Sequence, residues 1–160
     1  MGDTKSLQSD EAIKKMKEIA ENKTALFCTF TGNTSIETRP MHTQLIDEDG
    51  CFWFMGDKNN HSVSQIQQID KVQLLYAIND KSEFLSVEGT ASLNTDRKKI
   101  QELWSGFAKT WFPEGKDDPN IILIKVKTNN GFYWDTKHGK WVSMIKILPV
   151  PFPEKKWMMA

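Results

Sequence analysis

The chain has 160 residues, and its 21 basic and 21 acidic side chains leave it without formal net charge at neutral pH. This length is typical of a single domain with one sizeable core. Because the sequence has no basic stripe, no block of like charge and no apolar run of membrane-spanning length, we expect no nucleic acid and no membrane as partner. The first residues contain no apolar signal region, so the expected location is cytoplasmic.

The first predicted element is a helix over about residues 9–22, because Ile13, Met16 and Ile19 form an apolar stripe among charged residues. Alternating or continuous apolar runs bounded by turn residues then predict strands. These strands cover residues 25–31, 36–46, 51–55, 72–78, 84–93, 121–127, 132–135 and 140–147. Pro40 removes one ladder hydrogen bond from the second strand, so we expect a strand edge or a bulge there.

Residues 51–69 combine a strand, a polar loop and a helix. The run from Cys51 to Met55 is entirely apolar and predicts a strand buried on both faces. After the loop, Val63, Ile66 and Ile69 recur at helical spacing. The first backbone N–H groups of such a helix could hold a phosphate, but Asn60 or Ser62 could equally cap the helix, and the local pattern alone favours the cap.

A further helix is predicted to begin near Thr95 and to run as far as Phe107, and residues 111–119 are too rich in proline and glycine for regular structure. A turn is expected at residues 129–131. Short strands joined by hairpins, with two or three helices, predict a mainly β fold, an antiparallel barrel with peripheral helices. The domain is expected to cover residues 1–148, followed by an extended, proline-rich tail at 149–160.

Two features bear on chemistry. Cys28 and Cys51 lie in apolar runs without CxxC spacing or a nearby histidine cluster, so we expect no metal site and buried free thiols, with an adventitious disulfide as the lesser alternative. Arg39 precedes Pro40 in a strand that is otherwise poor in charge. Its guanidinium could form a forked pair with a phosphate, or it could pair at the surface with an acidic neighbour, Glu37 or Asp57.

Taken in order, several segments resemble one family over about residues 10–147. They are Arg39-Pro40-Met41, residues 52–58, His61 before the helix, residues 85–91, residues 111–119 and Tyr133-Trp134-Asp135. This ordered set is similar to the general stress protein branch of the pyridoxamine 5′-phosphate oxidase-like split barrels. The resemblance implies a six-stranded antiparallel split β-barrel that forms a homodimer, with FMN in clefts at the dimer interface.

The resemblance also implies roles for individual residues. Arg39 would hold the FMN phosphate, and the start of the helix after the loop would complete the phosphate site. The flavin ring would lie against the second strand and the end of the third, and two tryptophans would come from the partner subunit's side of the cleft. The implied cofactor-binding residues are Arg39, Pro40, Met41, Met55, Gly56, Asn60, His61, Ser62, Trp111 and Trp134.

Two positions depart from the family pattern, which usually has lysine in place of Ser62 and threonine in place of Gly56. Loss of a charge-assisted contact to the phosphate predicts FMN affinity that is weaker by about one to two decades. The family's true oxidases need a basic cluster near the C-terminus, and residues 137–144 contain only two lysines and one histidine. Oxidation of pyridoxamine 5′-phosphate is therefore not expected, and no catalytic residue is assigned.

The leading hypothesis is an FMN-binding general-stress-type flavoprotein with a redox role, such as a small flavin reductase or oxidase. The alternatives are a non-catalytic protein that holds flavin, an interaction module that has lost FMN, or a split barrel that binds haem or a deazaflavin. The missing lysine at Ser62 favours the alternatives, whereas Arg39 and the aromatic residues argue against the loss of FMN.

Overall fold

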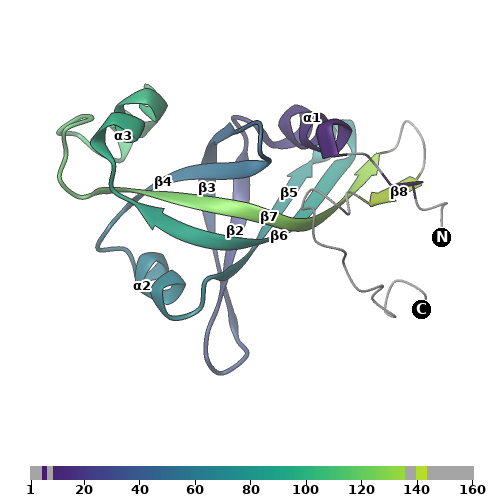
Figure 1. The fold of residues 1–160 in the computed structure, drawn as a ribbon, viewed down its shortest axis with the longest axis horizontal. Coiled ribbons are helices and arrows are strands. Elements are labelled where there is room, and N and C mark those ends of the chain that lie inside the picture. The colour runs from purple at the N-terminus through teal and green to yellow at the C-terminus, as the bar shows by residue number, and fades with distance from the viewer. Residues whose placement is uncertain (1–4, 7–8, 136–139, 144–160) are drawn as a thin grey trace.

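The computed structural model describes residues 5–6, 9–135 and 140–143 (Figure 1). Its strands are β1 (Lys5–Ser6), β2 (Thr24–Phe30), β3 (Ile36–Ile46), β4 (Cys51–Asp57), β5 (Lys71–Ile78), β6 (Glu83–Asn94), β7 (Ile121–Asp135) and β8 (Lys140–Ser143). Its helices are α1 (Ser9–Ala20), α2 (His61–Gln68) and α3 (Arg97–Leu103), with short 3-10 turns at Asn79–Lys81 and Ala108–Thr110. The predicted tail at 149–160 and the end of the last predicted strand lie outside the described residues.

Six strands close into an antiparallel barrel. Neighbouring strands follow the order β7-β4-β3-β2-β5-β6, and β6 pairs back with β7 to complete the ring. Strand β8 extends the sheet beyond β7, and β1 adds to β8 in parallel. The helices lie outside the ring (Figure 1). The predicted fold, a six-stranded antiparallel barrel with peripheral helices, is therefore confirmed.

The barrel interior forms the main core. Inward-facing Phe27 and Phe54 meet edge to face, with ring centroids 5.1 Å apart and planes at 90°. Met16 and Ile19 of α1 belong to the same buried cluster, so this helix packs on the barrel through the apolar stripe predicted for it. Asn22, with φ of 60°, follows α1 in the left-handed conformation typical of a helix end.

A second buried cluster lies on the outer side of β4 and β7. It contains Trp53, Ile100, Phe112, Ile121 and Leu123, and it joins α3 and the segment that follows α3 to the barrel wall. Because side chains alternate along a strand, β4 sends Phe52 and Phe54 inward and Trp53 outward. The prediction that residues 51–55 form a strand buried on both faces is confirmed.

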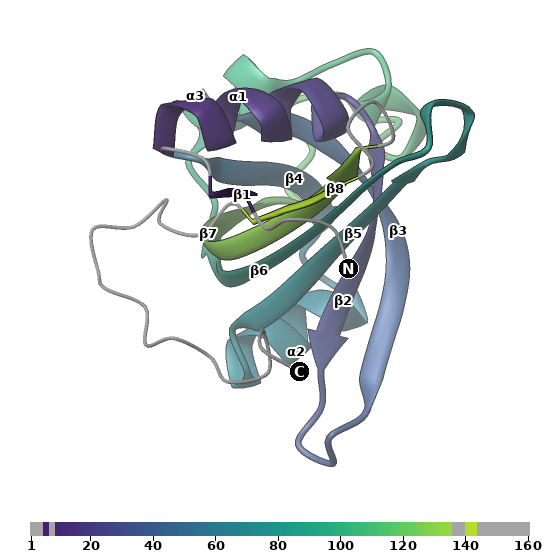
Figure 2. The ribbon, with the colours of Figure 1, turned by 90° about the vertical axis from the view of Figure 1, so that its right-hand side faces the viewer.

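Strand β3 pairs along its two edges over different lengths. Residues Ile36 to His42 pair with β2, whereas pairing with β4 is confined to Thr43, Leu45 and Ile46. Pro40 therefore lies where the β4-side edge of β3 is open, as its missing N–H predicted. The β2–β3 hairpin projects beyond the rest of the barrel (Figure 2).

Two sequence predictions were wrong. The turn expected at residues 129–131 is instead an uninterrupted part of β7, with a register shift opposite Glu88 and Gly89. Side chains fix this bulge, because Asn129 donates to Thr90 Oγ1 at 3.0 Å and Asn130 donates to Glu88 Oε2 at 2.9 Å. The helix expected to reach Phe107 ends at Leu103.

Both cysteines are buried and free, as predicted. In the part of the chain that the structure describes, no helix combines the length and the apolar character needed to cross a bilayer.

Candidate functional site

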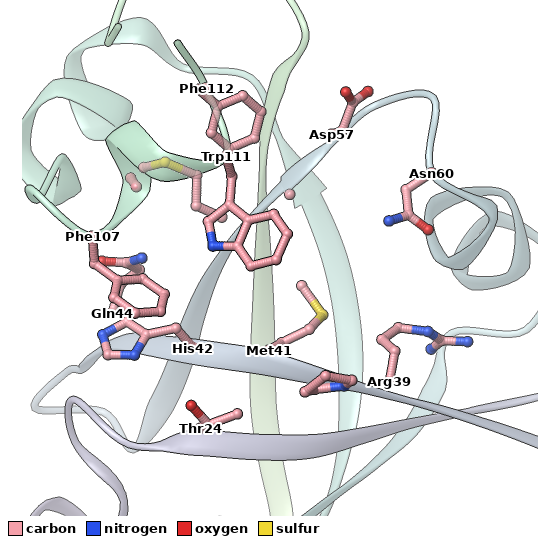
Figure 3. Close-up of a pocket in the computed structure, with 14 residues that line it drawn as sticks. Thr24, Arg39, Met41, His42, Gln44, Asp57, Asn60, Phe107, Trp111 and Phe112 are labelled. Carbon is pink, nitrogen blue, oxygen red and sulfur yellow. The ribbon is translucent and has the colours of Figure 1, made fainter.

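A cavity of about 500 Å³ opens where β3 separates from β4 (Figure 3). If the β3–β4 ladder continued beyond the Thr43–Phe54 pair, residues 39–42 would face residues 55–58. The strands diverge instead, so residues from both faces of β3 line the space along its open edge. The lining residues are Thr24, Arg39, Pro40, Met41, His42, Gln44, Met55, Gly56, Asp57, Asn60, Phe107, Ala108, Trp111 and Phe112.

An aromatic wall comes from the segment after α3. Phe112 is buried in the outer cluster and so anchors this segment to the barrel. Trp111 beside it is 70 % exposed, and its indole extends toward Met41 on β3 (Figure 3). A large, exposed aromatic ring over an apolar strand edge offers a flat surface on which a planar ligand can stack.

Gly56 leaves room at the end of β4. A Cβ atom placed on it would lie 3.8 Å from both Ile124 Cδ1 and Met41 Cε, which is ordinary van der Waals contact. Space therefore does not require glycine at this position. The lack of a side chain widens the cavity between Met41 and the end of β4.

Arg39 supplies a guanidinium at one side of the cavity, the same side as Asn60 at the start of α2 (Figure 3). Its Nη2 donates to Thr29 Oγ1 at 3.0 Å and to Gln65 Oε1 at 3.1 Å, and its Nη1 donates to the Phe27 carbonyl oxygen at 3.4 Å. The Glu37 carboxylate lies 3.8 Å from Nη2. The acidic neighbour anticipated from the sequence is therefore Glu37.

Burial changes the proton affinity of two residues that line the cavity. Desolvation lowers the pKa of Arg39. The negative charge of Glu37 opposes this change, and Cys28 opposes it to a smaller extent. Because arginine titrates far above neutral pH, its guanidinium stays charged. Burial also lowers the pKa of His42, which favours the neutral imidazole.

The start of α2 is capped from within the chain. Asn60 Oδ1 accepts hydrogen bonds from the Ser62 backbone N–H at 3.1 Å and from the Ser62 hydroxyl at 3.3 Å. The cap interpretation of this segment is confirmed. Ser62 is 2 % exposed and does not line the cavity, whereas His61 is exposed and its Nε2 lies 3.6 Å from Glu37 Oε2.

Trp134 lies on a different surface. Together with Leu26, Leu75, Ala77 and Phe84 it lines an open apolar face on the outside of β2, β5, β6 and β7, which we call the apolar face. Three of its side chains are well exposed, since Leu26 is 48 %, Leu75 36 % and Phe84 38 % accessible. Leu26 is the register partner of Pro40, so the apolar face adjoins the cavity.

Seven of the ten residues predicted from the sequence line this one cavity: Arg39, Pro40, Met41, Met55, Gly56, Asn60 and Trp111. His61 and Ser62 lie beside it at the start of α2, and Trp134 lies on the apolar face. Trp111 lines the cavity of its own chain, and the placement of Trp111 and Trp134 on the partner subunit's side of a cleft stays a prediction.

Sequence reasoning missed several neighbours of the site. His42 and Gln44 follow Pro40 at the two-residue spacing of a strand face, a signal that could have indicated them. Phe107 was assigned to a helix and instead lies in the aromatic wall. Gln65, which holds Arg39, gave no signal, because its contact joins two elements that are distant in the sequence.

Comparison with known proteins gives two kinds of match. Residues 10–154 match the model of the family described as pyridoxamine 5′-phosphate oxidase like. No curated protein matched the sequence. Solved structures, in contrast, share the fold over most of the chain.

A Clostridium acetobutylicum protein related to general stress protein 26 has a TM-score of 0.73 at 20 % identity, over 89 % of this chain and all (100 %) of its own. General stress protein 26 from Bacillus anthracis has a TM-score of 0.69 at 20 % identity, over 86 % of this chain and 100 % of its own. The general stress FMN/FAD binding protein from Xanthomonas citri has a TM-score of 0.68 at 22 % identity, over 91 % of this chain and 100 % of its own. At these identities the matches establish the fold alone.

Proposed function

Because the chain belongs to the pyridoxamine 5′-phosphate oxidase-like family, we propose that it is a flavin-binding protein of the general stress type and that the cavity between β3 and β4 holds FMN. The observation that carries this proposal is the pairing of a fixed guanidinium, Arg39, with an exposed aromatic wall in one cavity. The relatives from Xanthomonas citri and Nostoc punctiforme are described as FMN/FAD binding and FMN binding.

The residues present fit the parts of such a cofactor. A planar, largely apolar ring system needs flat apolar walls, which Met41, Met55 and Trp111 offer. A phosphate at the end of a flexible chain needs a fixed cation, and arginine is suited to it because its planar fork matches phosphate geometry. The volume of about 500 Å³ lies in the usual range for cofactor sites.

When bound, the flavin would supply the capacity to accept and pass on electrons. The chain's own residues would hold the ring and exclude water from one of its sides. Of the described lining residues, those that titrate are Arg39, His42 and Asp57. Because only these three of the described lining side chains titrate, the cavity also supports a second candidate, a protein that holds flavin without catalysis.

We also propose that two copies of the chain associate through the apolar face. Leu26, Leu75 and Phe84 expose a continuous apolar surface next to the cavity, of the kind that marks protein interfaces. A partner seated on the apolar face would lie next to the open side of the cavity, because Leu26 of this face pairs with Pro40, which lines the cavity. This arrangement would bring the flavin close to the dimer interface.

The test of the flavin proposal is to purify the protein without added cofactor and to record its visible absorption. FMN is then titrated while tryptophan fluorescence is followed. A flavin spectrum, or saturable quenching at one FMN per chain, supports the proposal. An absence of both would leave the barrel without a flavin function.

Reduction by NADH or NADPH, followed with a set of electron acceptors, separates the two candidates. Turnover supports a reductase or oxidase. A bound flavin that is never reduced, or that is reduced and never reoxidised, supports the non-catalytic candidate.

A further inference from the structure

A carboxylate stands beside the cation that faces the cavity. Glu37 precedes Arg39 by two residues on β3, so both side chains leave the same side of the strand. Glu37 Oε2 lies 3.8 Å from Arg39 Nη2 and 3.6 Å from His61 Nε2, and it accepts a hydrogen bond of 2.6 Å from Gln65 Nε2. Groups from β3 and α2 thus converge on one acidic side chain.

Gln65 fixes the positions of both charges. It is 7 % exposed, its Oε1 accepts from Arg39 and from Thr29 Oγ1, and its Nε2 donates to Glu37. The amide therefore holds the guanidinium on one side and the carboxylate on the other. Because the two charges are held close together, the guanidinium is partly neutralised before any ligand arrives.

We infer that Glu37 is a specificity determinant of this cavity. It lowers the affinity for the phosphorylated flavin, FMN, relative to the affinity for the unphosphorylated form, riboflavin. The inference rests on the proposed function, namely that a flavin binds between β3 and β4. It concerns a residue that does not line the cavity and that acts through Arg39.

The physical basis is competition for one cation. A phosphate that reaches Arg39 brings negative charge close to the Glu37 carboxylate, and like charges repel at this range. Relief of the repulsion requires Glu37 to leave Arg39 and to give up its bond to Gln65. A terminal hydroxyl, as in riboflavin, incurs neither cost because it is uncharged.

Solvent limits the size of the effect. The Glu37 side chain is 45 % exposed, so water screens part of the repulsion. We therefore expect removal of the charge to strengthen FMN binding by about tenfold, which corresponds to ~1.4 kcal/mol. Riboflavin affinity should not change.

The test compares the dissociation constants of FMN and riboflavin for the unmodified protein, for Glu37→Gln and for Glu48→Gln. Glutamine at 37 removes the charge but keeps an oxygen that can accept from Gln65. Glu48 is an exposed acid in the β3–β4 turn, so its substitution changes the net charge by the same amount away from the cavity. Each titration is run at low and at physiological ionic strength.

A rise in FMN affinity in Glu37→Gln alone, with riboflavin unchanged and a gain that shrinks as salt is added, supports the inference. Flavin binding with the same ratio of the two constants in all three proteins overturns it and leaves the proposed function standing. An equal gain for both ligands also overturns it, because the effect would then not depend on the phosphate. Failure of all three proteins to bind either flavin overturns the proposed function and the inference together.

Discussion

The His42 ring stacks on the Phe107 ring, with centroids 4.3 Å apart and planes inclined by 26°. His42 belongs to β3, whereas Phe107 follows α3, so the pair joins the barrel to the aromatic wall of the cavity. Phe107 is 49 % exposed, and the stacked His42 ring covers part of its surface. The protonation of one histidine is therefore tied to the wall of the candidate site.

Stability should fall on mild acidification because of His42. Burial lowers the pKa of His42 below its ordinary value of 6.5, so the unfolded chain takes up the proton at a higher pH than the folded chain. The contribution of His42 to the stability of the fold is present in full above pH 6.5. It is lost as the pH falls through the lower pKa that His42 has in the folded chain. Urea unfolding at about pH 7.5 and about pH 5.5 measures the loss, which should be smaller in His42→Gln. An unchanged pH dependence in this variant would contradict the prediction.

Arg39→Ala should weaken FMN binding far more than riboflavin binding. The variant leaves the phosphate without its cation while the charge of Glu37 remains, and we expect about a tenfold or greater loss for FMN. Arg39→Lys keeps the positive charge but loses the planar fork. Its affinity for FMN should therefore lie between that of the unmodified protein and that of Arg39→Ala. Isothermal titration with both flavins measures the difference, and equal losses for the two ligands would show that Arg39 does not act on the phosphate.

Trp111→Ala, unlike Arg39→Ala, should weaken the binding of both flavins. Because the indole would stack on the flavin ring that both ligands share, the affinities for FMN and riboflavin should fall by a similar factor, about three- to tenfold for one aromatic contact. Trp111→Phe keeps a flat ring and should retain most of the affinity. Because Trp111 is 70 % exposed, neither change should alter the midpoint of thermal unfolding appreciably. A loss confined to FMN would place Trp111 near the phosphate and contradict the stacking role.

Leu75→Glu should dissociate the proposed dimer. Leu75 lies in the middle of the apolar face, where a buried and unpaired carboxylate opposes association. Ile36→Glu is the matched control, because Ile36 is 56 % exposed but lies at the start of β3 and not among the residues of the apolar face. Sedimentation velocity should give a monomer for the first variant and a dimer for the second. A dimer that persists in Leu75→Glu would show that the interface does not lie on the apolar face.

Gly89→Ala should destabilise the barrel. A Cβ at this position would collide with Val126 Cγ1 and lie 2.7 Å from the carbonyl oxygen of Lys127, a backbone atom of the neighbouring strand. We expect a loss of about 1–3 kcal/mol in the free energy of unfolding, as for other overpacked sites. Gly32→Ala has nothing within 4 Å and should change stability by less than about 0.5 kcal/mol. Equal unfolding midpoints for the two variants would contradict the prediction.

Local patterns were enough to predict much of this fold. Residues 51–69 formed the expected strand, loop and helix, because continuous apolar residues followed by helical spacing leave few alternatives. The open edge at Pro40 followed from the missing N–H. The family resemblance supplied the number of strands, which local patterns did not.

What the sequence failed to predict depended on contacts between distant segments. The pair Asn129-Asn130 is typical of turns, but cross-strand hydrogen bonds to Thr90 and Glu88 hold it in a bulge within β7. Phe107 continued the apolar spacing of α3, yet stacking on His42 gives its ring a partner outside the helix. The convergence of Gln65, Glu37 and Arg39 likewise arises only in the folded barrel, where α2 packs beside β2 and Gln65 reaches the side chains of β3.

The partial pairing of β3 has a consequence for solubility. An open strand edge presents unpaired backbone groups to which another chain could add a strand, a common route to aggregation. Pro40 lies within this edge and has no N–H to offer to an incoming strand, and the charged residues Glu37 and Arg39 precede it on β3. One proline can thus line a ligand cavity and also protect the opened barrel from intermolecular sheet growth.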